Sequence, residues 1–313
     1  MTTLKIKATK PQAKFLTMDR KYRLFCAGFG AGKSEAMASS AMMDAAQSPT
    51  ALIGCYAPTY DLVKTISVAR IQMKLMDAGI RHSYNGQDKV IYTSHPGFGD
   101  FIFRTLDQPQ RIVGYETYTA HVDELDTLKT EHARIAWNQV IARNRQQPKG
   151  MPEPFNQASA YTTPEGFKFC YDRWVANANE YYGMVSASTY SNPYLPKDYI
   201  DSLKASYPAN LIDAYIEGRF VNLTSGAVYP DFDRKLNGCL DKEETREVLH
   251  IGMDFNVYNM AGVVCVIRDG NPIAVRELTG IRDTPAMIEA IEQMYPDHKI
   301  FICLLYTSDA ADE

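Results

Sequence analysis

The stretch GFGAGKS at residues 28–34 constrains the fold of this chain more than any other feature of its sequence. An apolar, strand-like run at 22–27 leads into it, and a helical stretch at 35–47 follows. Strand, glycine-rich loop and helix in this order are the setting of a nucleotide-binding P-loop. Ala27 stands where the first glycine of G-x-x-x-x-G-K-S belongs, so the pattern is matched in its relaxed form. The alternative is a chance glycine-rich turn.

Each residue type in this loop has a role in holding a triphosphate. Gly28, Gly30 and Gly32 let backbone N–H groups turn toward phosphate oxygens, and the helix N-terminus adds its partial positive charge. Lys33 would reach the β- and γ-phosphates, and the Ser34 hydroxyl would ligate Mg²⁺. The loop predicts an α/β fold with a mostly parallel sheet and flanking helices, in which the phosphates lie at the carboxyl edge of the strands.

A P-loop needs an acidic partner on a neighbouring strand, and YTAHVDEL at 118–125 supplies two carboxylates. Asp123 would hold Mg²⁺ through water, while Glu124 would polarise the attacking water as the catalytic base. An adjacent Asp-Glu pair is common by chance on helix surfaces, but this one ends a β-rich run downstream of the P-loop. The pair therefore indicates ATP hydrolysis and not nucleotide binding alone.

Length and composition limit the classes of protein that fit. A chain of 313 residues favours two domains, because single cores stop growing near ~250–300 residues. The net charge of −4 gives no general attraction to DNA, so any DNA contact would come from a local basic surface such as residues 142–150. The simpler interpretation of that segment is an ordinary solvated loop. The six cysteines lack CxxC spacing, so we expect neither zinc nor disulfides. The longest apolar run, 261–267, is too short to cross a bilayer, and we expect no membrane partner.

A second domain is predicted after the polar, irregular stretch at 218–247. The predicted order is β-β-β-α-β, with RDGNP at 268–272 as a hairpin turn. The strands are expected at 248–253, 261–268, 272–278 and 299–302, and the helix at 284–294. This order suits the opening of a ribonuclease-H-like fold, in which the first and fourth strands lie side by side.

These motifs together resemble the large terminase subunit of tailed bacteriophages, the motor and nuclease that pumps DNA into a capsid. The P-loop alone is generic, whereas its combination with an Asp-ended strand well downstream of the Asp-Glu pair is specific. The likeness covers about residues 11–302. Besides the P-loop it rests on FIFRTLDQPQRIVGYETYTAHVDELDTL (101–128), YTTPEG (161–166), STYSNPYLP (188–196), SGAVYPDFD (225–233) and IGMDFN (251–256), in the order of the family.

The resemblance implies further residues of the ATPase site. Gln12 would contact the adenine, and Thr162 and Thr163 would couple hydrolysis to motion by sensing the γ-phosphate end of the site. A Ser/Thr turn before proline explains these two threonines equally well. In a ring, an arginine from a neighbouring subunit would complete the site; Arg104 and Arg111 are the candidates, with simple solvation of a strand as the alternative.

At the second site, the resemblance makes Asp254 a ligand of Mg²⁺ or Mn²⁺ in a two-metal endonuclease. An ordinary strand-end residue is the alternative, because such cleavage needs several converging carboxylates. The second acid is expected just past Ile302, where CLLYTSDAADE (303–313) reads like a sequencing adapter translated in frame. We therefore expect the native sequence to end near residue 302, with an incomplete and inactive nuclease domain.

These features predict four segments. They are a P-loop ATPase domain at 1–189, a lid and linker at 190–247, the N-terminal part of a ribonuclease-H-like nuclease domain at 248–302, and a non-native tail at 303–313.

The leading interpretation is a viral DNA-packaging motor subunit that hydrolyses ATP to translocate duplex DNA into a procapsid and cuts concatemeric DNA. Its expected partners are double-stranded DNA, the portal protein, the small terminase subunit and further copies of the chain in a ring, in the cytoplasm of the infected bacterial host. The alternative enzyme is a helicase-like ATP-dependent DNA translocase with a non-catalytic second domain. A nucleotide-dependent scaffolding module that never turns over is the alternative from another class.

Overall fold

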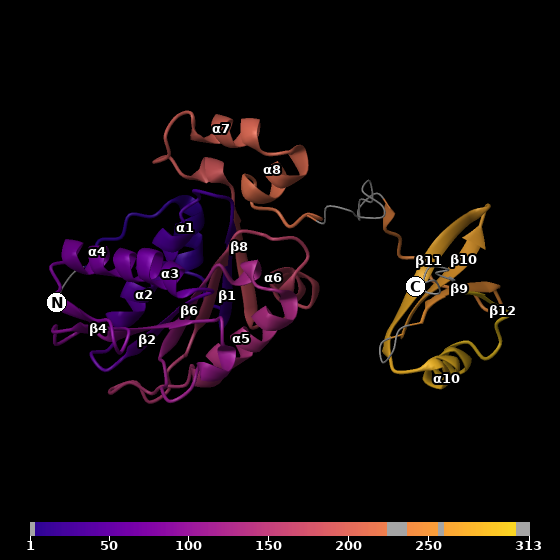
Figure 1. Ribbon diagram of the computed structural model, residues 1–313, viewed down its shortest axis with the longest axis horizontal. Coiled ribbons are helices and arrows are strands. Elements are labelled where there is room, and N and C mark those ends of the chain that lie inside the picture. Colours follow the sequence, from indigo (N-terminus) through magenta and orange to yellow (C-terminus); the bar gives the residue numbers. More distant parts are fainter. Residues whose placement is uncertain (1–3, 224–236, 256–259, 305–313) are drawn as a thin grey trace, which may run out of the picture. The chain divides into compact units, whose positions relative to one another are not determined.

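The computed structural model describes residues 4–223, 237–255 and 260–304 of the chain (Figure 1). The chain separates into two compact units, Met1–Ser225 and Gly226–Glu313. The SGAVYPDFD motif at 225–233 and the tail from 305 onward lie outside the described residues. Within the described residues, no helix is both long enough and apolar enough to span a membrane.

An eight-stranded sheet forms the centre of the first unit, in the order β3-β4-β5-β2-β6-β7-β1-β8. The strands are β1 (Tyr22–Ala27), β2 (Leu52–Ala57), β3 (His82–Asn85), β4 (Val90–Thr93), β5 (Asp100–Thr105), β6 (Thr119–Asp123), β7 (Ala158–Thr162) and β8 (Tyr182–Ala187). All pairs from β5 to β8 along this order are parallel, and the β3–β4 and β4–β5 pairs are antiparallel. The expectation of a mostly parallel sheet is confirmed. The P-loop strand β1 and the acidic strand β6 flank β7, so their carboxyl ends lie close together.

Helices cover both faces of this sheet (Figure 1). They are α1 (Lys10–Leu16), α2 (Lys33–Ala45), α3 (Tyr60–Leu62), α4 (Ala69–Asp77), α5 (Thr130–Arg143) and α6 (Phe169–Tyr171). Helices α7 (Tyr199–Ser206) and α8 (Ala209–Tyr215) follow β8. Met42 of α2 and Ile71 of α4 share one buried apolar cluster, while Trp137 of α5 and Phe169 of α6 belong to another. The central strands between these layers are buried on both faces, as is typical of parallel sheets.

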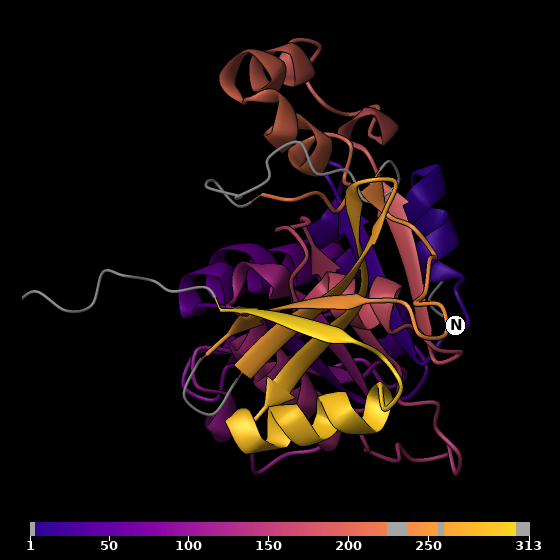
Figure 2. The ribbon, with the colours of Figure 1, turned by 90° about the vertical axis from the view of Figure 1, so that its right-hand side faces the viewer.

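The P-loop elements lie close to where the sequence predicts them. Strand β1 has the expected bounds, but α2 spans Lys33–Ala45 and so begins and ends two residues earlier than expected. Gly32, in the left-handed conformation, is the N-cap residue, so the helix begins directly at Lys33. Beyond β8, α7 and α8 stand apart from the helices that cover the sheet (Figures 1 and 2).

The second unit contains a four-stranded sheet in the order β11-β10-β9-β12, and helix α10 packs on it (Figure 2). The elements are β9 (Leu249–Asp254), β10 (Met260–Arg268), β11 (Asn271–Ile281), α10 (Thr284–Met294) and β12 (Ile300–Leu304). Strands β9 and β12 pair in parallel, so the expected adjacency of the first and fourth strands is confirmed.

The hairpin between β10 and β11 turns at Asp269 and Gly270, whose φ angles are 52° and 79°. Two consecutive positive φ angles suit a tight β-hairpin, and Asp-Gly is a favoured pair for such a turn. Strand β11 continues to Ile281 and β12 to Leu304, both past the ends expected from the sequence. Burial alternates along β9, as expected for a sheet with one face on the core.

Candidate ATP site

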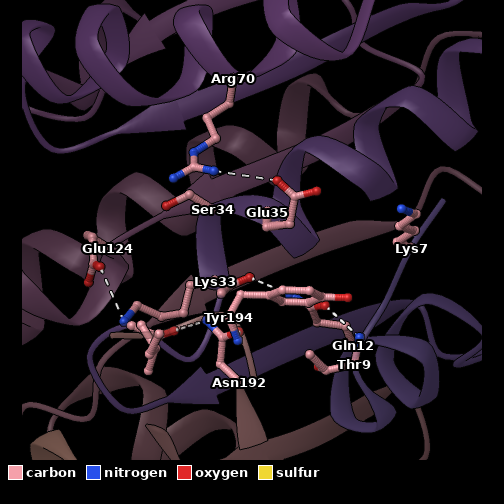
Figure 3. A pocket seen from close by; sticks show the side chains of 13 residues that line it. Lys7, Thr9, Gln12, Lys33, Ser34, Glu35, Arg70, Glu124, Asn192 and Tyr194 are labelled. Atoms are coloured by element: carbon pink, nitrogen blue, oxygen red, sulfur yellow. Dashed lines mark hydrogen bonds and ion pairs between the residues drawn. The ribbon is translucent and has the colours of Figure 1, made fainter. Parts of the chain in front are cut away.

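A cavity of about 550 Å³ opens at the P-loop of the first unit (Figure 3). Its wall comes from the segment around α1, the loop and first turn of α2, α4, and the segments that follow β6 and β8. The sequence-predicted residues that line it are Gln12, Gly30, Gly32, Lys33, Ser34 and Glu124.

Two glycines allow the tight turn of the loop below this cavity. Gly30 and Gly32 have φ angles of 71° and 90°, a region that other residues rarely adopt. Since α2 begins at Lys33, its first backbone N–H groups have no partner within the helix and carry the positive end of the helix dipole. The Gln12 amide nitrogen donates to the Gly32 carbonyl at 2.9 Å and fixes this turn.

Lys33 is buried, with 8% of its side chain exposed. Its ammonium donates to the carbonyls of Ala27 at 3.3 Å and Gly28 at 3.4 Å, and it lies 3.7 Å from Glu124 Oε1 (Figure 3). A buried ammonium without phosphate needs such acceptors. The lysine and the acid that the sequence assigns to one site therefore meet in the structure.

Asp123 ends β6 and is 2% exposed. Burial, followed by the charge of Glu124, raises the pKa of Asp123 to about 7, while Lys33 acts in the opposite direction. Its Oδ1 atom is buried and has no hydrogen-bond partner among the residues that the structure describes. A buried, unpartnered carboxylate oxygen is an acceptor that a hydrated Mg²⁺ would satisfy, so Asp123 fits the ligand role that the sequence gives it.

Glu124 follows Asp123 in the left-handed conformation, with φ of 49°. This is uncommon for a residue other than glycine, and such strain often marks functional sites. The Glu124 N–H donates to the Tyr161 carbonyl of β7 at 2.7 Å, which holds the backbone in this turn. The turn directs the two adjacent side chains differently: Asp123 stays within the sheet edge, and Glu124 reaches the cavity.

Thr162 and Thr163, at the end of β7, are in contact with this acidic turn. The Thr163 N–H donates to Glu124 Oε2 at 3.4 Å, and Thr162 Oγ1 accepts from the Asp126 N–H at 3.2 Å. Thr163 Oγ1 is buried and lacks a hydrogen-bond partner within the described part of the chain. The threonines thus lie beside the acid that the sequence makes the catalytic base.

Arg104 and Arg111 do not line the ATP cavity of their own chain. They border a separate hollow of about 310 Å³, together with Lys89. Arg104 donates to the Asp88 carbonyl at 2.9 Å and packs over the Tyr115 ring, whereas Arg111 is exposed.

Asp254 lies at the end of β9 in the second unit and is exposed. Among the described residues, no three His, Cys, Asp or Glu side chains are grouped so that they could hold a metal ion. The structure thus gives the position of Asp254 but no set of partner ligands for it.

Several cavity residues were missed by sequence reasoning: Lys7, Thr9, Glu35, Arg70, Asn192, Tyr194 and Leu195. Asn192 donates from its amide to the Gly30 carbonyl at 2.6 Å. The only sequence signal was the segment 188–196, which carries part of the family resemblance but suggested no role in the site.

The segment after β8 also holds the P-loop through its backbone. The Gly28 N–H donates to the Ala187 carbonyl at 3.0 Å, and the Phe29 N–H donates to the Tyr215 carbonyl at 2.6 Å. A Cβ on Gly28 would lie 2.5 Å from the Ile216 carbonyl oxygen, so only glycine allows this approach. The P-loop is therefore fixed between the sheet and the α7–α8 region.

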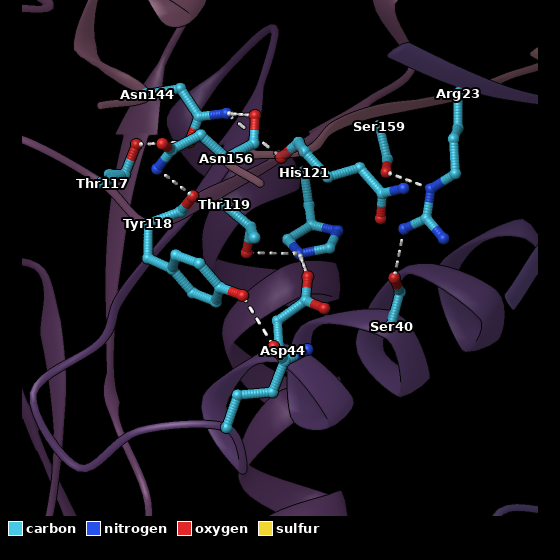
Figure 4. A network of polar contacts seen from close by, with 12 residues as sticks. Arg23, Ser40, Asp44, Thr117, Tyr118, Thr119, His121, Asn144, Asn156 and Ser159 are labelled. Atoms are coloured by element: carbon cyan, nitrogen blue, oxygen red, sulfur yellow. Dashed lines mark hydrogen bonds and ion pairs between the residues drawn. The ribbon is translucent and has the colours of Figure 1, made fainter. Parts of the chain in front are cut away.

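A buried polar network lies beneath the site and ties α2 to the sheet (Figure 4). His121, two residues before Asp123, lies 3.0 Å from Asp44 Oδ2 of α2 and 3.0 Å from the Tyr161 hydroxyl of β7. Arg23 donates to Ser40 of α2 at 2.8 Å. These contacts hold the P-loop helix against the strands that carry the acidic turn.

Comparisons with known proteins agree with this arrangement. Residues 24–236 match the family model described as terminase large subunit, T4likevirus-type, N-terminal. None of the curated proteins matches the chain.

Among solved structures, the large terminase of a thermophilic bacteriophage, in complex with ADP, has a TM-score of 0.60 at 16% identity, covering 94% of this chain and 77% of that one. The ATPase domain of the large terminase from Thermus phage P74-26 has a TM-score of 0.53 at 15% identity, covering 69% and 94%. The HK97 bacteriophage large terminase has a TM-score of 0.53 at 11% identity, covering 95% and 70%.

At these identities the structural likeness shows the fold alone: a large α/β sheet like that of terminase ATPase domains. The family follows from the family model, which spans most of the chain. This chain belongs to the terminase large subunit family.

Proposed function

We propose that the chain is an ATP-driven DNA-packaging motor subunit whose hydrolytic site is the cavity at the P-loop. The observation that carries this proposal is the convergence of Lys33 and Glu124 at 3.7 Å beside the buried Asp123. Phosphoryl transfer to water needs a cation for the phosphates, a carboxylate for the metal and a base for the water, and Lys33, Asp123 and Glu124 could supply them. Nucleotide binding is supported by the large terminase of the thermophilic bacteriophage, which was solved with ADP and with ATP-γ-S.

The residues divide the chemistry among them. The P-loop N–H groups and Lys33 would bind the phosphates. Gln12 lies beside Thr9 in the cavity wall, away from Glu124, and would contact the adenine (Figure 3). Ser34 and Asp123 would hold Mg²⁺, which when bound supplies charge neutralisation at the phosphate oxygens. Once the Lys33 ammonium turns to the phosphates, the Glu124 carboxylate loses its ion pair with Lys33 and can take a proton from the attacking water.

Two sets of contacts connect this site to the rest of the unit. The Thr163 N–H donates to the Glu124 carboxylate, so a movement of the Glu124 side chain would be transmitted to the end of β7. The P-loop backbone is bonded to the segments around α7 and α8, which we propose to be the lid at 190–247. Hydrolysis would therefore move the lid relative to the ATPase domain at 1–189.

The packaging machine as a whole extends the proposal beyond one chain. A ring of such subunits would act with the portal protein and the small terminase subunit in the host cytoplasm. In the ring, Arg104 or Arg111 would enter the site of a neighbouring subunit. Contacts to double-stranded DNA would go to phosphates, so binding would weaken steeply with salt.

The second unit is proposed to be the start of a ribonuclease-H-like nuclease domain at 248–302. The support is the β9–β12 pairing and the position of Asp254, one ligand for Mg²⁺ or Mn²⁺.

The test is steady-state ATP turnover with Mg²⁺ by wild type, Lys33→Ala and, as a matched control, Lys129→Ala, an exposed lysine outside the cavity wall. Lys33→Ala should lower turnover by at least roughly 100-fold, and the control should match wild type. A wild-type rate no higher than that of Lys33→Ala would contradict the ATPase and favour a scaffolding role.

A further inference from the structure

Arg70 lines the ATP cavity, although neither the P-loop nor the acidic turn carries it. It is the second residue of α4, and its Nη1 atom lies 3.5 Å from Glu35 Oε2. Glu35 directly follows Ser34 in the first turn of α2. Figure 3 shows the Arg70 side chain pointing toward the wall on which Ser34 and Glu35 lie. A guanidinium thus stands at the magnesium and γ-phosphate end of the site.

A local irregularity of the backbone puts Arg70 in this position. A π-helical segment, Val63–Val68, joins α3 to α4 and ends two residues before Arg70. A π turn inserts one residue, which rotates the following side chains by about 100° around the helix axis. Arg70 and Lys74, one turn apart, consequently both face Glu35. Such π segments often occur at functional sites.

The ion pairs of Glu35 leave Arg70 available for another anion. The Lys74 ammonium lies 2.5 Å from Glu35 Oε1 and its side chain is 20% exposed, whereas Arg70 is 47% exposed and its contact is longer. A half-exposed ion pair contributes little and is exchanged readily.

We propose that Arg70 binds the γ-phosphate of ATP within its own chain. When the triphosphate enters, the Arg70–Glu35 ion pair breaks and Glu35 remains paired with Lys74. Arginine suits this role because its planar donors form bidentate, charge-assisted hydrogen bonds with phosphate oxygens. Lys74 keeps Glu35 neutralised after the exchange, so the carboxylate does not repel the nucleotide. This inference rests on the proposed ATPase function and adds a residue that distinguishes ATP from ADP.

The test measures binding of ATP-γ-S and of ADP, each with Mg²⁺, to the full chain by calorimetric titration. For Arg70→Ala we expect ATP-γ-S affinity to fall by roughly tenfold or more, with ADP affinity within about twofold of wild type. Arg81→Ala is the matched control, because it removes an exposed guanidinium that lies shortly after the same helix and does not line the cavity. It should leave the ratio of the two affinities unchanged.

The outcomes separate this inference from the proposed function. Equal losses for ATP-γ-S and ADP in Arg70→Ala, or no loss for either, would overturn the role of Arg70 while leaving the ATPase intact. The same selective loss in Arg81→Ala would also overturn it, since the effect would then be a general one of lost positive charge. A wild-type chain that binds neither nucleotide would contradict the proposed function and this inference with it.

Discussion

The Lys33 ammonium lies 3.7 Å from a carboxylate oxygen of Glu124, so the P-loop lysine and the acid after β6 share one cavity. Lys33 follows β1 and the glycine-rich loop, Glu124 follows β6, and β7 lies between these two strands in the sheet. Their meeting depends on the parallel order of β6, β7 and β1, because the carboxyl ends of these strands lie at one edge. The geometry that hydrolysis needs is therefore a direct product of the sheet topology.

Asp123 should make the metal-free protein less stable as the pH rises. Burial raises its pKa to about 7 from the ordinary 3.8, so the folded chain holds a proton that the unfolded chain has lost. This contribution is complete below about pH 4 and disappears as the pH passes about 7. Asp123→Asn removes the titration, and in EDTA at pH 8 its Tm should exceed that of wild type by at least ~2 °C.

Magnesium with ADP should reverse this order, because the asparagine lacks the charge that Mg²⁺ requires. Thermal unfolding followed by circular dichroism at pH 5 and pH 8 gives both comparisons. Equal Tm values for the variant and wild type at pH 8 in EDTA would show that Asp123 is not held as a strained buried carboxylate.

Gly32→Ala should abolish nucleotide binding and destabilise the fold. Gly32 has φ of 90°, and a Cβ would collide with the Gln12 amide nitrogen, whose bond to the Gly32 carbonyl fixes the loop. Gly79 is the matched control: its φ is 68°, but nothing lies within 4 Å of its Cβ position. Gly79→Ala should cost about 1 kcal/mol from backbone strain alone, and Gly32→Ala about 2 kcal/mol or more.

Urea unfolding and ADP titration of the two glycine variants separate these costs. If Gly32→Ala bound ADP as well as Gly79→Ala does, the loop around Gly32 would not be the phosphate cradle.

His121→Ala should weaken the connection between α2 and β6. The imidazole bridges Asp44 and the Tyr161 hydroxyl, and it is fully buried. Its removal leaves a buried carboxylate without this partner and creates a cavity, so the free energy of unfolding should fall by about 2–4 kcal/mol. His82→Ala on β3, which loses one contact at the sheet edge, should cost less than about 1 kcal/mol. Similar losses in both variants would contradict a structural role for the Asp44–His121–Tyr161 bridge.

The sequence predicts the P-loop, β1 and β6 well, because each is marked by a local pattern: strand-like runs, glycines before Lys33, and two acids at a strand end. It also predicts the hairpin at Asp269 and Gly270 from turn chemistry alone. The sequence pattern places the start of α2 two residues late, because the cap formed by Gly32 is a backbone property that the pattern does not show.

The rest of the site depends on tertiary structure. Arg70 reaches the cavity through a π-helical segment, and VKTISV carries no signal for that register. Asn192 and Tyr194 come to the P-loop because the chain folds back after β8, a return that no local pattern fixes. The left-handed turn at Glu124, which separates the two acids, is likewise held by a hydrogen bond to a distant strand.

The measurement that tests the central claim most directly compares Mg²⁺-dependent ATP turnover and ATP binding in wild type and Glu124→Gln. Glutamine keeps the size of the side chain but does not accept a proton from water. We expect turnover to fall by roughly 100-fold or more, with ATP bound at least as tightly as by wild type, because Lys33 loses its competing carboxylate. Turnover by Glu124→Gln at the wild-type rate would contradict the assignment of this site as a hydrolytic centre.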